Sequence, residues 1–155
     1  MPVRNLSEYL NQHDVRYVAM NHVPAYTSQE LAEVAHVSGH DIAKTVILNI
    51  DGQLTMAVLP ACEKVDLRKV QEFTKSRWVS IAQESEFQNR FPLCELGGMP
   101  PFGNLYGMPV LVSSTLANED VIAFNAGSHT ELVKMSFDDY SKLVEPTILN
   151  FTLMH

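Results

Sequence analysis

The chain has 155 residues, 46% of them apolar, with 11 Lys and Arg against 18 Asp and Glu and a net charge of −7. This length and composition predict one domain over residues 1–155 with a sizeable core, and the acidic charge argues against non-specific coating of a nucleic-acid backbone. No apolar run reaches the roughly 18 residues of a membrane span. Because the first residues also lack an apolar signal region, we expect a cytoplasmic protein with no membrane partner.

The N-terminal part of the chain predicts two helices and a strand. Leu6, Tyr9 and Leu10 recur at helical spacing, which predicts a helix over residues 5–13. Residues 17–20 are strand-like. Thr27-Ser28-Gln29-Glu30 matches a capping box and predicts a helix over about residues 28–35, followed by a loop over residues 36–41.

The clearest local signal is Asp51-Gly52 between two apolar runs, residues 44–50 and 54–59. Both central residues of a type I′ turn need positive φ, and an Asp-Gly pair tolerates it, so this pattern predicts a β-hairpin. Lys44 then lies at the entrance of the first strand.

A further helix is expected from Asp66, as the N-cap, to about Ser76, with Leu67, Val70 and Phe73 on its buried stripe. The same stretch carries five cations within fourteen positions. They form either a solvated helix face or a patch that meets phosphates: Lys64, Arg68, Lys69, Lys75 and Arg77.

The C-terminal half predicts a helix over residues 85–90 and short strands at 78–81, 110–112, 121–124 and 131–135, the last two joined by a turn at 125–127. Ser136 or Asp138 caps a last helix that ends near residue 143. Short helices mixed with hairpin-joined strands predict an α+β fold with a mixed or mostly antiparallel sheet.

Three glycines and two prolines occur in Gly97-Gly98-Met99-Pro100-Pro101-Phe102-Gly103, between apolar runs. Glycine permits close approach of a ligand to the backbone, and proline fixes the direction of neighbouring N–H groups. Such donors suit a carbonyl or a developing oxyanion. The alternative is an ordinary tight connection between a helix and a strand.

The candidate chemistry is sparse outside this loop. Lys44 and Gly127-Ser128-His129 are candidates to join it, although a lysine at a strand entrance and a histidine in a turn are also ordinary surface residues. G-x-S-x-G, P-loop, dinucleotide-binding glycine and H-E-x-x-H motifs are absent. Cys62 and Cys94 have neither a C-x-x-C spacing nor a histidine at ligand spacing, so we expect reduced thiols and no zinc site, disulfide, metal or cofactor.

The residues together resemble the family of YbaK proteins and prolyl-tRNA-synthetase editing domains, which are aminoacyl-tRNA deacylases. The resemblance runs from about residue 22 to residue 143. It rests on Ala43-Lys44-Thr45, Val58-Leu59-Pro60-Ala61 with Val65-Asp66-Leu67, the Gly97–Gly103 loop with the family's G-x-x-x-P signature at Gly97–Pro101, and Phe124-Asn125-Ala126-Gly127-Ser128-His129. It implies a compact α+β domain with a curved mixed sheet and hydrolysis of the ester of a mischarged aminoacyl-tRNA.

The resemblance also implies roles for individual residues. Backbone N–H groups of Gly97, Gly98 and Met99, with Pro100 and Pro101 shaping the loop, would face the substrate carbonyl, and Lys44 would hold the ester or the terminal phosphate region. The expected substrate-binding residues are Val23, Tyr26, Ile47, Phe102, Gly103, Gly127, Ser128 and His129. The partners would be aminoacyl-tRNA carrying Ala, Cys, Ser or Thr, in this family usually tRNA for proline, and an aminoacyl-tRNA synthetase.

Two other hypotheses remain open at this point. The domain could bind an aminoacyl or nucleotide ligand without catalysis, or it could be a metal-assisted hydrolase that uses His22, His36 and His40, although Gly39 lies between the last two. The editing hypothesis requires Lys44 and the Gly97–Gly103 loop to line one pocket.

Overall fold

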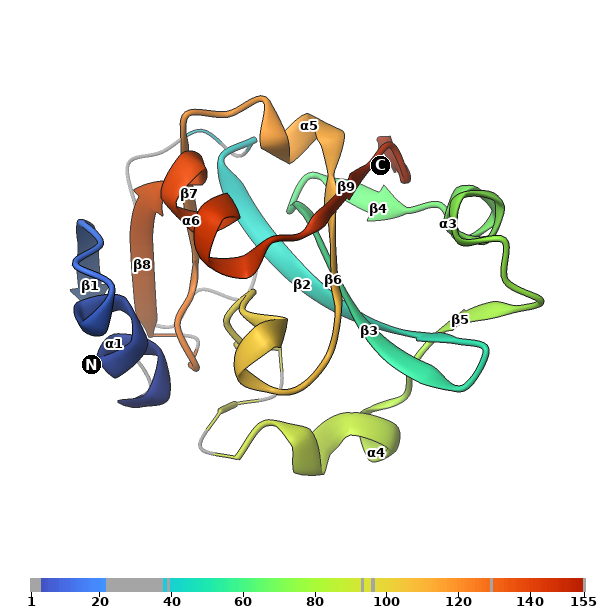
Figure 1. Ribbon diagram of the computed structural model, residues 1–155, viewed down its shortest axis with the longest axis horizontal. Coiled ribbons are helices and arrows are strands. Elements are labelled where there is room, and N and C mark those ends of the chain that lie inside the picture. The colour runs from blue at the N-terminus through green and yellow to red at the C-terminus, as the bar shows by residue number, and fades with distance from the viewer. Residues whose placement is uncertain are drawn as a thin grey trace.

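The computed structural model describes residues 4–21, 38, 40–92, 94–95, 97–128 and 130–154. Within them, a twisted sheet of eight strands has the order β1-β8-β7-β2-β3-β6-β9, with β5 paired to β2, and a second sheet pairs β10 with β4 (Figure 1). The strands are β1 Tyr17–Asn21, β2 Ile42–Ile50, β3 Gln53–Pro60, β4 Glu63–Val65, β5 Val79–Ile81, β6 Val110–Ser113, β7 Val121–Asn125, β8 Glu131–Ser136, β9 Thr147–Leu149 and β10 Thr152–Met154.

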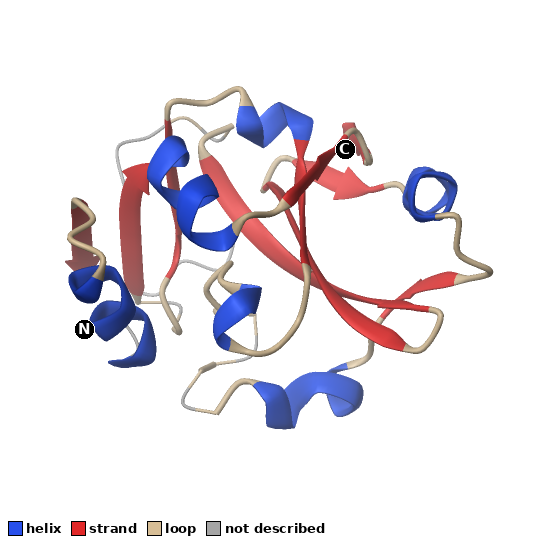
Figure 2. Ribbon diagram, in the orientation of Figure 1, coloured by secondary structure: helices blue, strands red, loops and turns tan. Residues whose placement is uncertain are grey.

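The helices are short and lie around the sheet (Figure 2). They are α1 Arg4–Gln12, α3 Leu67–Thr74, α4 Glu84–Phe87, α5 Ser114–Ala117 and α6 Phe137–Val144, with 3-10 turns η1 Gln88–Arg90 and η2 Gly103–Leu105. No helix within the described residues is long and apolar enough to cross a membrane. The predicted α+β class with a mixed sheet is confirmed.

The β2–β3 hairpin has the predicted turn. Asp51 and Gly52 have φ values of 50° and 91°, and Ile50 pairs with Gln53 across the turn. Strand β2 begins two residues earlier than predicted, at Ile42. Lys44 is therefore the third residue of the strand.

Strand β2 also pairs in parallel with β7, but this ladder is brief. Its register joins Ile42 to Ala123 and Ala43 to Phe124, whereas β3 follows β2 over the whole length of the hairpin. The parallel pairing ends there. Lys44 follows directly, and after it Thr45, whose hydroxyl contacts the Met99 carbonyl.

Two of the predicted helix caps are confirmed. Asp66 accepts hydrogen bonds from the N–H groups of Arg68 and Lys69, and Ser136 accepts one from the N–H of Asp139, so Ser136 is the N-cap of α6. The side chain of Phe73 is 51% exposed, contrary to the prediction, and Val70 is the fully buried residue of α3. An eight-residue helix covers only one narrow strip of the sheet, and Phe73 falls outside it.

The core lies mainly on one face of the sheet. Leu6 and Leu10 of α1 and Phe137 and Tyr140 of α6 join one cluster with the aromatic residues around Phe102. A second cluster on the other face contains Val70 and Phe151. The helix expected over residues 28–35 lies outside the described residues, as do residues 36, 37 and 39 of the loop expected to follow it.

Candidate active site

Backbone hydrogen bonds join the Gly97–Gly103 loop to the turn after β7. The Gly127 N–H donates to the Gly98 carbonyl at 2.8 Å, and the Glu95 N–H donates to the Gly127 carbonyl at 2.7 Å. A Cβ added at Gly98 would lie 3.0 Å from the backbone Cα and C atoms of Ser128. Glycine at this position therefore lets two backbone segments approach one another directly.

The far end of the loop is held from the core. Tyr140, which is fully buried, donates its hydroxyl to the Pro101 carbonyl at 2.6 Å. The Phe102 ring is also fully buried and lies 5.6 Å from the Phe124 ring, centroid to centroid. Gly103 packs against Val110, where an added Cβ would come within 2.6 Å of the Val110 side chain. Phe102 and Gly103, expected to bind substrate, thus support the loop from within the core.

Most peptide N–H groups of the loop already have a partner. The Gly98 N–H donates to the Glu95 carbonyl at 2.9 Å, and the Phe102 N–H donates to the Pro100 carbonyl at 2.8 Å. The Gly97 N–H is 3.3 Å from the sulfur of Met99, and neither proline has an N–H. Within the described residues, the Met99 N–H has no acceptor. It is therefore a candidate donor to a ligand.

Strand β2 meets the loop through Thr45. The Thr45 hydroxyl donates to the Met99 carbonyl at 3.3 Å, and Ala43, Ile47 and Met99 belong to the same buried cluster. Ile47, an expected pocket wall, is only 3% exposed. This face of β2 anchors the loop.

Lys44 projects from the opposite face of β2, because successive strand residues point to alternate sides. Ile42 on that face packs with Ala123. Burial lowers the pKa of the half-buried Lys44 ammonium, while the charges of Cys62 and Glu63 oppose that shift. The loop and Lys44 therefore reach β2 from opposite faces at adjacent residues, whereas the editing hypothesis expected them to line one pocket.

Asn125, the last residue of β7, belongs to the Phe124–His129 motif but had no expected role. Asn125 follows Phe124 on β7 as Lys44 follows Ala43 on β2, so the two occupy matching positions just after the last pair of the ladder. The two share a face, because Ala123 packs with Ile42 there. The Asn125 Oδ1 atom is buried and has no hydrogen-bond partner among the described residues. Buried polar atoms are nearly always paired, so this oxygen is a candidate to accept a hydrogen bond from a ligand or an ordered water.

A group of metal-ligating side chains lies beside Lys44. His40 Nδ1 is 3.3 Å from Cys62 Sγ, and a carboxylate oxygen of the buried Glu63 completes a set of donor atoms within 4.8 Å of one another. Burial, followed by the charge of Glu63, raises the pKa of the Cys62 thiol. Cys94, by contrast, lies 3.5 Å from the Tyr106 hydroxyl. His40 thus lies beside Cys62 in space, although no histidine is at ligand spacing from either cysteine in the sequence.

Several predicted site residues are not described. Val23, Tyr26 and His129, together with His22 and His36 of the metal-assisted hypothesis, lie outside the described residues, and their roles stay predictions. The structure brings the Gly97–Pro101 loop, Gly127 and Ser128 together. The sequence feature that could have identified Asn125 is a polar residue at the end of an apolar strand.

Comparisons with known proteins place this chain in a family. The model of the aminoacyl-tRNA editing domain matches residues 22–143. The multifunctional Ser/Thr-tRNA deacylase ProXp-y of Escherichia coli K12 is 25% identical over 154 residues, covering 96% of this chain and 91% of that protein. The prolyl-tRNA editing protein ProX of Acetoanaerobium sticklandii is 25% identical over 142 residues, covering 88% of this chain and 86% of that protein.

A solved structure shares the fold. A candidate trans-editing enzyme for prolyl-tRNA synthetase superposes with a TM-score of 0.83 at 15% identity, covering 97% of this chain and 96% of that one. The family model spans most of the chain, including the Lys44 strand, the Gly97–Gly103 loop and the turn after β7. The chain belongs to the aminoacyl-tRNA editing domain family and is an aminoacyl-tRNA deacylase.

Proposed function

We propose that this protein is a trans-editing hydrolase that removes a small amino acid, Ala, Cys, Ser or Thr, from mischarged tRNA, with tRNA for proline as its carrier. The observation that carries the proposal is the contact of the Gly97–Pro101 loop with Gly127 and Ser128, which leaves the Met99 N–H without an acceptor within the described residues. The names of the relatives, a Ser/Thr-tRNA deacylase and a prolyl-tRNA editing protein, support this substrate class.

An aminoacyl ester needs little activation. Water loses a proton to solvent as it adds to the ester carbonyl carbon, which produces a tetrahedral oxyanion. The bond to the ribose oxygen then breaks, and that oxygen takes a proton from solvent as the amino acid leaves. The Met99 N–H would donate to the oxyanion. One well-placed donor is typically worth about 3–4 kcal/mol in the transition state, and holding the ester and the water in place adds more.

Lys44 and Asn125 would hold the substrate from the face of β2 opposite the loop. The Lys44 ammonium would bind the terminal phosphate region, and the unpaired Asn125 Oδ1 would accept a hydrogen bond from the α-ammonium of the aminoacyl group. A hydrogen bond to a charged group is worth about 1.5–3 kcal/mol. Gly127 would leave room for the amino-acid side chain.

The pocket would select the amino acid by size. One methylene changes the free energy of binding by only about 1–3 kcal/mol. A single apolar wall of the pocket therefore discriminates only weakly between Ala, Ser, Cys and Thr. The net charge of −7 disfavours tight binding to tRNA by charge alone. An aminoacyl-tRNA synthetase that delivers the tRNA is therefore the partner we propose.

The direct test is deacylation of a panel of tRNAs charged with Ala, Cys, Ser or Thr, by wild type, Lys44→Ala and Lys44→Arg, with exposed Lys142→Ala, outside the cation-rich stretch, as the matched control. Turnover of at least one species, reduced in Lys44→Ala and kept in Lys142→Ala, supports the proposal. Turnover that Lys44→Ala leaves intact would remove Lys44 from the mechanism. No turnover across the panel would favour a non-catalytic binding module.

A second pair of variants tests the donor itself. Met99→Pro deletes the N–H, whereas Met99→Leu keeps it at similar volume. We expect Met99→Pro to lower kcat by about 100–1000-fold and Met99→Leu to stay near wild type, with circular dichroism used to check that both fold. Equal kcat for the two variants would exclude the Met99 N–H. Full activity in chelator would argue against the metal-assisted hydrolase.

A further inference from the structure

The His40–Cys62–Glu63 cluster has the composition of a metal site. It offers one imidazole nitrogen, one thiol sulfur and one carboxylate oxygen, all within 4.8 Å of one another. The nitrogen and sulfur are already 3.3 Å apart. Zinc binds such donors at about 2.0–2.3 Å, which places the ligand atoms of a tetrahedral ion about 3.3–3.8 Å apart. The cluster needs shifts of only about 1 Å to reach that spacing.

The protein backbone fixes the two segments that supply the donors. The Ala61 N–H donates to the Ile42 carbonyl at 2.8 Å, which holds the turn before Cys62 against the entry to β2. Glu63 begins β4, whose pairing with β10 sets Glu63 opposite Met154. Because neighbouring strands hold both ends, the donor atoms converge without a ligand.

Glu63 is oriented by hydrogen bonds of the kind that support metal-binding carboxylates. It is only 5% exposed, and the hydroxyls of Thr115 and Thr152 both donate to its Oε1 atom. Both donors use the same oxygen, so Oε2 is the atom that an ion would bind. Hydrogen bonds of this kind fix a ligand's orientation and raise metal affinity.

We propose that His40, Cys62 and Glu63 bind a divalent transition-metal ion of the zinc type, with a fourth coordination position open to water or a ligand. Sulfur and imidazole donors select zinc, cobalt and similar ions over magnesium or calcium. Binding releases the Cys62 proton to solvent, because a thiolate is the ligand. The proposal is independent of the deacylase mechanism, in which these three side chains have no role.

The Lys44 ammonium offers a competing arrangement. It lies close enough to Cys62 and Glu63 for their charges to affect it, and it could balance Glu63 in the absence of an ion. The test must therefore detect the metal–sulfur bond directly rather than an effect on activity.

The experiment is titration of the full, tag-free, reduced chain with Co²⁺ after chelator treatment, followed by absorption spectroscopy, with calorimetry for Zn²⁺ stoichiometry. We expect one equivalent to bind and to produce a thiolate-to-cobalt charge-transfer band. Cys62→Ser should abolish the band and Cys94→Ser should keep it. The exposed His40→Gln should weaken binding, and His13→Gln, its matched control, should not.

A weaker change tests the supporting hydrogen bonds. Thr152→Val removes one donor to Glu63 and is expected to lower metal affinity by about 10–100-fold. No charge-transfer band at stoichiometric Co²⁺, or a band that survives Cys62→Ser, would overturn the proposal. A band lost in Cys94→Ser would place the metal elsewhere and would overturn it as well.

Discussion

Replacing the hydrogen of Gly98 with a methyl group should push the Gly97–Gly103 loop away from the turn at Gly127 and Ser128. The missing side chain of Gly98 lets the loop touch the backbone of Ser128, where an added Cβ would lie 3.0 Å from two backbone atoms. Backbone atoms cannot rotate away, so Gly98→Ala must push the segments apart. The Gly127 N–H to Gly98 carbonyl hydrogen bond, at 2.8 Å, crosses the same contact and would lengthen.

The cost follows from these two contacts. Overpacking by one methyl group costs about 1–3 kcal/mol, and weakening one hydrogen bond costs about 0.5–1.5 kcal/mol. We expect the free energy of unfolding to fall by about 2 kcal/mol, which lowers Tm by about 4–8 °C in a domain of this size. The contact must relax by a few tenths of an ångström, which displaces the neighbouring Met99 N–H and should lower kcat/KM for deacylation, by less than the roughly 100-fold that a 1 Å misplacement costs.

Gly52→Ala is the matched control. Gly52 has a φ of 91° and open space around it, so an alanine there should cost about 1–2 kcal/mol through backbone strain and leave deacylation unchanged. Thermal unfolding and single-turnover deacylation are measured on both variants. If Gly98→Ala loses stability but keeps wild-type turnover, the loop contact is structural only and the oxyanion assignment is wrong. Wild-type Tm in Gly98→Ala would refute the packing argument.

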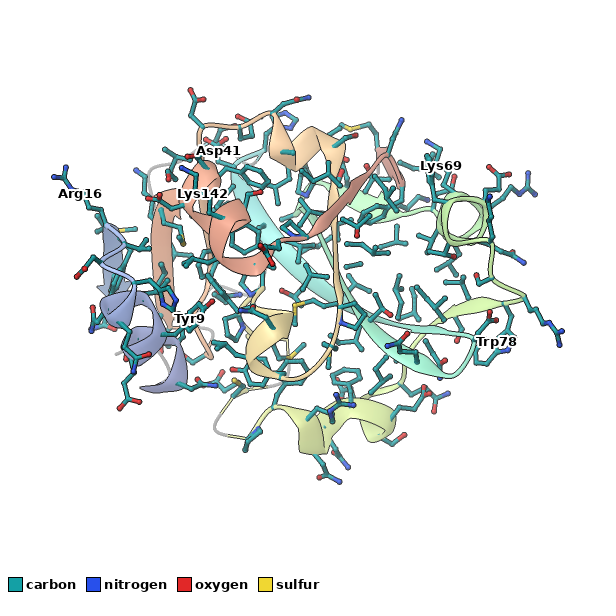
Figure 3. The ribbon with its side chains drawn as sticks, viewed as in Figure 1. Tyr9, Arg16, Asp41, Lys69, Trp78 and Lys142 are labelled. Atoms are coloured by element: carbon teal, nitrogen blue, oxygen red, sulfur yellow. The ribbon has the colours of Figure 1, made fainter. Side chains whose placement is uncertain are left out.

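Three further predictions concern residues outside the contact between Gly98 and Ser128. Tyr140→Phe leaves the Pro101 carbonyl without its 2.6 Å donor and should lower stability by about 1–3 kcal/mol, measured by denaturant unfolding; unchanged stability would contradict the support assigned to Tyr140. Hydrogen bonds from the Gln83 N–H and the Asn49 side chain lower the pKa of Glu86 below its usual 4.5. A lowered carboxyl pKa stabilises the fold above pH 4.5, and the contribution disappears as the pH falls through the lowered value. Glu86→Gln should therefore reduce Tm at pH 7, with the difference closing in acid; a constant difference would exclude this ionisation. Exposed Arg68→Glu, in the cation-rich stretch that ends near Trp78 (Figure 3), should raise KM for aminoacyl-tRNA and lower its salt slope by about 1, whereas Arg16→Glu, the same change at the opposite end of the molecule, should not.

Local chemistry explains how much of the fold was predictable. Asp51-Gly52, Asp66 and Ser136 act on their immediate neighbours, so a turn and two helix caps could be located from a few residues. Strands β4 and β10 were not predicted, because three-residue strands leave almost no periodic pattern and form through pairing with one another.

The site was predictable in its residues more than in its arrangement. Glycine and proline content pointed to the Gly97–Gly103 loop, but which N–H stays without an acceptor depends on Glu95 and on the sulfur of Met99. His40 and Cys62 are 22 residues apart, and only the β2–β3 hairpin brings them together. Contacts made by strand pairing over such separations carry no local sequence signal.

The parallel β2–β7 ladder has a consequence for the order in which the protein matures on the ribosome. Strand β7 follows β2 by about 80 residues, and the Thr152 hydroxyl reaches Glu63 across 89 residues. A nascent chain that has completed the β2–β3 hairpin therefore exposes Lys44 and Glu63 without their later partners. Deacylase function should appear only after the turn at Gly127 has left the exit tunnel, so an incomplete chain would not hydrolyse charged tRNA beside the ribosome that is making it.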